Sequence, residues 1–190
     1  MKKVLQCTLF FAAISAGLIL QSCNKLKDAI PAQDISYTST ADLVIAPISD
    51  TTSQVAIGQI AVSYNLDSMI SAQTSGKLGF SNIQSVKITG ISLALSDADA
   101  ADNFANFTYV GAAFYSDANS TPYTIAHVDN NPDNYSASLS PAVASADQDV
   151  KNYFSANMMF HYQLTGKLRR ATTNTLHCHA VITYTINVKA

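Results

Sequence analysis

The sequence contains no glutamate and no tryptophan, and only 13% of its residues are charged. Globular proteins typically devote about 25% of their residues to charged side chains, so this surface must be built largely from Ser, Thr, Asn and Gln. The absence of glutamate removes a strong helix former, whereas Thr, Val, Ile and Tyr, which favour strands, are plentiful. The composition therefore predicts an all-β protein.

The chain also lacks the short motifs that identify common enzyme classes. It has no Gly-x-Ser-x-Gly, no His-Glu-x-x-His, no Cys-x-x-Cys and no glycine-rich phosphate loop, and it contains only seven glycines. Paired aspartates cleave glycosides in many hydrolases, but nothing selects one pair among the 13 acidic residues, all of them Asp. We expect a protein that is not an enzyme, and an envelope hydrolase ranks third among the alternatives.

The sequence has a single long apolar run, from residue 4 to residue 20, directly after Lys2 and Lys3. The run spans 17 residues and is interrupted by Gln, Thr and Ser. It is short for a membrane-spanning helix and typical of the hydrophobic region of a signal peptide. Leu-Gln-Ser-Cys follows at positions 20–23, so a small residue, Ser22, precedes Cys23.

This arrangement resembles the lipobox signal of bacterial lipoproteins of the Gram-negative type. The resemblance covers residues 1–24 and implies that Cys23 becomes the lipidated N-terminus, anchored to a membrane through its acyl chains. Asn24 follows the cysteine in place of Asp, which implies the outer membrane. The absence of an acidic run after Cys23 implies a domain that faces the periplasm. The alternative is an ordinary cleaved signal peptide that leaves Cys23 unmodified.

The sequence divides into three parts. Residues 1–22 are expected to be the lipoprotein signal peptide, 23–34 the lipidated N-terminus and a polar tether, and 35–190 a single β-sandwich domain. Without the signal, nine Lys and Arg (11 minus Lys2 and Lys3) face 13 Asp, which gives a net charge of −4. A net negative charge of this kind does not suggest binding to nucleic acid, which requires a basic surface. Cys178 is the one cysteine in the last part, so no disulfide is expected there.

Eight segments of the domain show the alternation or the β-rich composition of strands. They are 35–48, 55–63, 85–95, 107–116, 123–128, 135–139, 160–168 and 176–188. Together they predict an antiparallel sandwich, with a small closed barrel as the alternative. The alternation and the spacing of the connections resemble immunoglobulin-like sandwich domains of bacterial lipoproteins.

Local patterns add detail to this sandwich. The apolar phase changes at Gly90, which predicts a β-bulge, and the last two strands are expected to form a hairpin. Asn65 is predicted to cap a short helix, and the capping-box pattern of Ser145 and Gln148 predicts a second one. In the last strand, Cys178 is expected to face the core.

Two clusters of oxygen-bearing side chains are candidates for calcium. Asp97, Asp99, Asp102 and Asn103 form the denser cluster, and the segment 129–134 forms the second. Carboxylate and amide oxygens are the ligands that Ca²⁺ takes, although neither segment has the spacing of an EF-hand. Each segment is also explained as ordinary turn chemistry.

Three histidines form an alternative metal site. His177 and His179 share one face of the predicted last strand, and His161 would lie on the same face of the neighbouring strand in the expected hairpin. Three imidazoles would leave a zinc ion with an open position. The simpler interpretation is three solvated side chains on a sheet.

These features favour a non-enzymatic lipoprotein of the cell envelope that acts as an interaction or structural module. The expected partners are the membrane, through the N-terminal lipid, and an envelope protein or a glycan. The alternative is an extracytoplasmic protein that binds a glycan, a small molecule or Ca²⁺. No resident cofactor is expected beyond this possible Ca²⁺.

Overall fold

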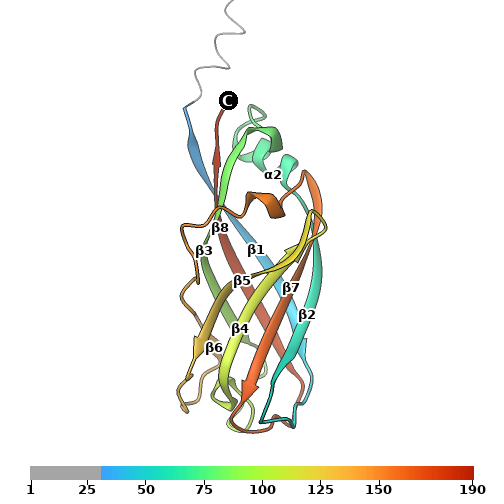
Figure 1. Ribbon diagram of the computed structural model, residues 1–190, viewed down its shortest axis with the longest axis vertical. Helices are drawn as coiled ribbons and strands as arrows, with labels where there is room; N and C mark the ends of the chain where they lie inside the picture. The colour runs from blue at the N-terminus through green and yellow to red at the C-terminus, as the bar shows by residue number, and fades with distance from the viewer. Residues whose placement is uncertain (1–30) are drawn as a thin grey trace, which may run out of the picture.

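A computed structural model describes residues 31–190, which form two four-stranded antiparallel sheets and one short α-helix (Figure 1). The strands are β1 (Gln33–Ile45), β2 (Gln54–Asn65), β3 (Ile83–Leu95), β4 (Phe107–Ser116), β5 (Asn119–Asp129), β6 (Ser138–Leu139), β7 (Asn157–Leu168) and β8 (Leu176–Val188). One sheet has the order β1-β8-β3-β6 and the other β2-β7-β4-β5. The predicted all-β antiparallel sandwich is confirmed, and all eight expected strands are present.

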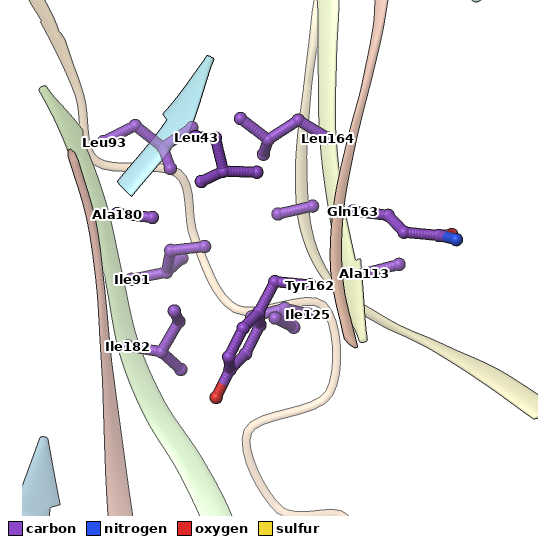
Figure 2. Close-up of a pocket in the computed structure, with 11 residues that line it drawn as sticks. Leu43, Ile91, Leu93, Ala113, Ile125, Tyr162, Gln163, Leu164, Ala180 and Ile182 are labelled. Atoms are coloured by element: carbon purple, nitrogen blue, oxygen red, sulfur yellow. The ribbon is translucent and has the colours of Figure 1, made fainter. Parts of the chain in front are cut away.

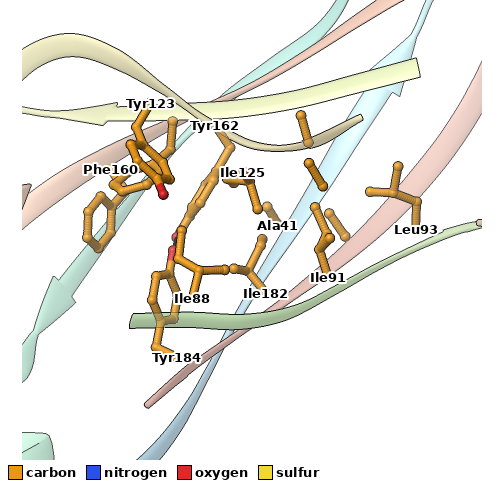
Figure 3. Close-up of a cluster of buried hydrophobic side chains, with 14 of the residues drawn as sticks. Ala41, Ile88, Ile91, Leu93, Tyr123, Ile125, Phe160, Tyr162, Ile182 and Tyr184 are labelled. Carbon is orange, nitrogen blue, oxygen red and sulfur yellow. Dashed lines mark hydrogen bonds between the residues drawn. The ribbon is translucent and has the colours of Figure 1, made fainter. Parts of the chain in front are cut away.

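The period-two pattern places the apolar side chains between the sheets. In β8 every second residue from Leu176 to Val188 is buried, while His177 and His179 face outward. Cys178 is 1% exposed, which confirms that it points into the core. Figure 3 shows the two sheets contributing side chains to one cluster, in which the hydroxyls of Tyr162 and Tyr184 approach each other.

The predicted bulge at Gly90 is confirmed, because the pairing of β3 with β8 shifts register between Ile88 and Gly90. The predicted hairpin of the last two strands is wrong. β7 pairs with β2 and β4, whereas β8 pairs with β1 and β3 in the other sheet. The connection 169–175 therefore crosses from one sheet to the other.

The helix α2 (Leu66–Gln73) is confirmed, with Asn65 as its cap: the Asn65 side chain accepts a hydrogen bond from the Ser68 N–H at 2.8 Å. The second predicted helix is wrong. The chain there forms only the 3₁₀ turn η4 (Lys151–Tyr153). Asp149 explains the difference, because its carboxylate accepts the Val86 N–H at 2.9 Å and ties the segment to β3.

The sandwich has two distinct ends. At the helix end, β1 begins beside the point where β8 finishes, and α2 lies close by (Figure 1). The opposite end, which we call the loop end, collects four connections: 46–53, 96–106, 130–137 and 169–175 (Figure 1). Among residues 31–190 no helix is both long enough and apolar enough to cross a membrane.

Candidate interaction surface at the loop end

Buried polar side chains concentrate at the loop end. Of the eight buried polar or charged residues in the described part of the chain, five lie there: Asp102, Asn103, Asn106, Asn131 and Thr172. Buried polar groups cost stability unless they are hydrogen-bonded, so such a cluster has to be a satisfied network. Within residues 31–190 no buried side-chain nitrogen or oxygen is without a partner.

Asp102 holds the β7–β8 connection. Its two carboxylate oxygens accept hydrogen bonds from the backbone N–H of Thr173 and Asn174, both at 2.9 Å. The Thr173 hydroxyl and the Asn174 side-chain amide donate to the same carboxylate at 2.7 and 2.8 Å. Burial raises the pKa of Asp102, but these hydrogen bonds outweigh it and leave the pKa below its ordinary value. The ionised carboxylate therefore holds the connection 96–106 against the connection 169–175.

Asn106 joins the same two connections a second time. Its side-chain amide donates to the carbonyls of Ala101 at 2.9 Å and Ala171 at 3.2 Å. Its own carbonyl accepts the backbone N–H of Arg169 at 2.7 Å and of Arg170 at 3.2 Å. Asn106 thus satisfies backbone groups on both sides of the corner at which the chain changes sheets.

Asn131 and Arg169 bring the β5–β6 connection into the network. The Asn131 amide donates to the carbonyls of Phe104 and Phe107 at 2.7 and 3.2 Å. The Arg169 guanidinium donates to the carbonyl of Asn131 at 2.7 Å and to that of Ala105 at 2.8 Å. These contacts hold three loops in one arrangement. Loops that are fixed before binding lose less conformational freedom when a partner docks.

The rim of this rigid end carries aromatic and charged side chains. Tyr135 is 61% exposed, and its hydroxyl reaches the Ala98 carbonyl at 3.4 Å. Arg170 and Asp133 form an exposed ion pair with a nitrogen–oxygen distance of 2.5 Å, and this pairing lowers the pKa of Asp133. Tyrosine and arginine are the residue types that protein interfaces use most as anchors.

The first candidate calcium cluster is not assembled as one ligand set. Asp97 accepts from His177, Asp99 caps its own turn through the N–H groups of residues 101 and 102, and Asp102 faces Thr173 and Asn174 as described. The Asn103 side chain accepts the Ala105 N–H at 2.9 Å and begins the 3₁₀ turn η3 (Phe104–Asn106). The four side chains thus bind different partners: Asp99 and Asn103 their own turns, Asp97 the start of β8, and Asp102 the β7–β8 connection.

The side chains of the second oxygen-rich segment, 129–134, also point to different partners. Asp129 lies 3.2 Å from His127, Asn131 is buried, and Asp133 turns to the two arginines. In the described residues, no group of three or more His, Cys or Asp side chains is arranged to hold a metal ion.

The three-histidine site is wrong, because it depended on the hairpin. His161 lies on β7, stacks on Tyr115 with ring centroids 4.5 Å apart, and contacts Asp117 at 3.3 Å. His177 and His179 lie on β8 in the other sheet, on one outward face as predicted. The structure therefore keeps this pair together and separates His161 from it.

Sequence reasoning missed the structural roles of Asn106, Asn131 and Arg169, which organise the loop end, although Asn131 lies in the segment 129–134 that was a candidate for calcium. A signal for Asn106 was present, because it lies between the buried residues Ala105 and Phe107. An amide inside such an apolar run has to find backbone partners. The roles of Asn131 and Arg169 could not be read from neighbouring residues, because their partners come from distant connections.

A small cavity lies between the two sheets. The cavity between the sheets, lined by side chains such as Ile91, Leu93 and Tyr162, has a volume of about 10 Å³ (Figure 2). One water molecule needs roughly 10–15 Å³ of such space. This cavity is therefore too small to hold a ligand.

No family model matches the sequence, and no curated protein matches it either. Among solved structures, the domain is similar to viral capsid proteins at low scores. The acid-stable capsid of Helicobacter pylori bacteriophage KHP30 gives a TM-score of 0.34 at 12% identity, covering 84% of this chain and 100% of that one. The decameric BFDV capsid protein gives 0.35 at 9% identity, with 84% and 100% covered. Likeness at this level carries no argument about function.

Proposed function

We propose that the chain is a non-enzymatic, lipid-anchored lipoprotein of the cell envelope whose loop end binds a partner protein. The observation that carries this proposal is the buried polar network of Asp102, Asn106 and Asn131, which fixes three connections while Tyr135 and Arg170 stay exposed. A network of this kind stabilises one loop arrangement, and a fixed arrangement is what specific recognition requires.

The direction of the chain supports the same proposal. β1 begins at the helix end, so a lipid on Cys23 would attach there, ten residues before Gln33. Ten extended residues reach at most about 35 Å. The loop end is then the end of the domain farther from the point of attachment, which leaves it accessible to a partner (Figure 1).

Two properties favour protein recognition over ligand storage. The cavity between the sheets, at about 10 Å³, is far smaller than the roughly 300–1,000 Å³ of a typical ligand pocket. The absence of tryptophan in the whole chain also removes the side chain that is most effective for stacking sugars. A rim with an exposed tyrosine and an arginine–aspartate pair suits a protein surface better.

The first test is affinity purification of the native protein in mild detergent, followed by mass spectrometry. Three forms are compared: wild type, Tyr135→Ala at the loop end, and Met159→Ala as a matched control. Met159 is 39% exposed on β7, close to the helix end, so its removal also deletes a large exposed apolar side chain. We expect one stoichiometric protein partner that is lost with Tyr135→Ala and retained with Met159→Ala.

Equal loss with both variants, or recovery of the chain alone, would contradict the loop-end proposal. In the second case, binding of glycans or small molecules becomes the function to test. The anchor is tested separately with Cys23→Ser, which should abolish incorporation of a labelled fatty acid. Labelling that persists in this variant would refute lipidation at Cys23.

A further inference from the structure

His177 and His179 form a pair of exposed imidazoles on the outer face of β8. Residues two apart on a strand point to the same side, with Cα atoms roughly 6.5 Å apart. Their side chains are 60% and 48% exposed. Both line a surface depression of about 150 Å³ with Asp42, Val44 and Ser96.

A carboxylate orients each ring of this pair. His177 Nδ1 lies 2.7 Å from Asp97, and His179 Nδ1 lies 2.5 Å from Asp42. An ionised carboxylate can only accept a hydrogen bond, so Nδ1 carries the proton in both rings. The Nε2 atom of each neutral ring therefore keeps its lone pair. This is the arrangement in which carboxylates prepare histidines to ligate metals.

The two carboxylates lie on opposite sides of β8. Asp42 belongs to β1 and pairs in register with His179, whereas Asp97 follows β3 and also accepts the His177 backbone N–H at 2.9 Å. Because Nδ1 and Nε2 lie on different sides of an imidazole, the Nε2 atom of each ring points away from its carboxylate. Both rings line the same surface depression, in which their Nε2 atoms are free of these carboxylates.

The other two histidines show the contrary orientation. In His127 and His161, Nε2 is the atom that faces a carboxylate, at 3.2 Å from Asp129 and 3.3 Å from Asp117. Within the described chain, only the two histidines of β8 have a carboxylate at Nδ1 and no carboxylate at Nε2. His127 and His161 become matched controls, since each is a histidine paired with an aspartate.

We propose that His177 and His179 bind one divalent transition-metal ion through their Nε2 atoms, with Asp42 and Asp97 as positioning residues. Two neutral imidazoles suit Cu²⁺, Ni²⁺ and Zn²⁺, and Cu²⁺ forms the tightest complexes of this series. The remaining coordination positions are open to water or to a side chain of a partner. The site adjoins the loop end, because Asp97 belongs to the connection 96–106, but the proposal does not rest on partner binding there.

The test is Cu²⁺ titration of the full chain in detergent, followed by electron paramagnetic resonance. We expect a one-to-one complex with nitrogen hyperfine structure from two imidazoles. His177→Gln or His179→Gln should weaken binding at least tenfold and remove one nitrogen from the spectrum. His127→Gln and His161→Gln should change neither. Unaltered circular dichroism of each variant shows that the exposed substitutions leave the fold intact.

The positioning residues are tested with Asp42→Asn and Asp97→Asn. Loss of an orienting carboxylate typically lowers metal affinity by about 10–100-fold. In the metal-free protein, ¹⁵N imidazole shifts of the facing histidine should also move toward the Nε2–H tautomer, which a purely structural role would not cause. Cu²⁺ binding that survives His177→Gln together with His179→Gln, or its absence in the wild type, would overturn the proposal.

Discussion

The hydroxyl of Tyr162 on β7 lies 3.1 Å from the hydroxyl of Tyr184 on β8, so the two sheets are joined by a polar contact inside an apolar core (Figure 3). Tyr162 also contacts Ser39 Oγ on β1 at 2.8 Å, and Ser39 in turn contacts Tyr64 of β2. This chain of hydroxyls fixes how one sheet is placed on the other, because each donor needs its partner at one position.

Tyr162→Phe should destabilise the domain by about 1–2 kcal/mol, because Ser39 and Tyr184 each lose a buried partner. Urea unfolding followed by circular dichroism measures the change. Tyr115→Phe is the matched control, since the Tyr115 hydroxyl accepts only an exposed bond from Gln59 at 3.2 Å. An equal effect of both substitutions would show that the internal chain of hydroxyls contributes nothing specific.

The same tyrosines predict how stability depends on alkaline pH. Burial raises the pKa of Tyr162 and Tyr184 above the ordinary value of 10.0, and Tyr184 is fully buried in the core. The folded state therefore favours the protonated form, and its stability is complete below the unfolded pKa and falls as the pH rises above about 10. The unfolding free energy should stay level between pH 8 and about pH 10 and decline above that, with a shallower slope in Tyr162→Phe. A flat profile would contradict the prediction.

The sequence was sufficient to predict the strands, because alternation reports directly on which side chains are buried. It assigned both faces of β8, the inward position of Cys178 and the bulge at Gly90. It did not predict the partners of β7 and β8, since alternation identifies the buried face of a strand and not the strand that receives its hydrogen bonds. A connection as long as 169–175 serves a hairpin or a crossing between sheets equally well.

The candidate sites show the same limit. Asp102 carries the carboxylate of a calcium ligand, but its hydrogen-bond donors are backbone and side-chain groups of Thr173 and Asn174, more than 70 positions away. The carboxylates that orient His177 and His179 come from β1 and from the residues after β3, so this pairing could not be predicted from neighbouring residues. A local sequence pattern identifies residues of the right chemical type. The strand order of the sheets determines which of these residues lie in contact.

Asp102→Asn should loosen the loop end and lower the unfolding free energy by about 2 kcal/mol, because an amide cannot accept all four hydrogen bonds that the carboxylate receives. Amide hydrogen exchange at Thr173 and Asn174 should accelerate first. Asp147→Asn is the control, since Asp147 is exposed and lies 3.5 Å from Lys87. Unchanged exchange at residues 173 and 174 would remove the basis for a rigid loop end.

Cys178 should be inert in the folded domain. Burial raises the pKa of its thiol to about 12, so almost no thiolate, the reactive form, is present at neutral pH. Its side chain also points between the sheets and is 1% exposed, so a reagent can reach it only when the domain opens.

Iodoacetamide labelling, quantified on the peptide that contains Cys178, should be at least 10³-fold slower in buffer than in denaturing urea, as expected for cooperative opening. Tyr162→Phe should accelerate this labelling by the same factor by which it raises the unfolding equilibrium constant. Tyr115→Phe should leave the labelling rate unchanged. Rapid labelling of the native protein would mean that β8 separates from its neighbours without global unfolding.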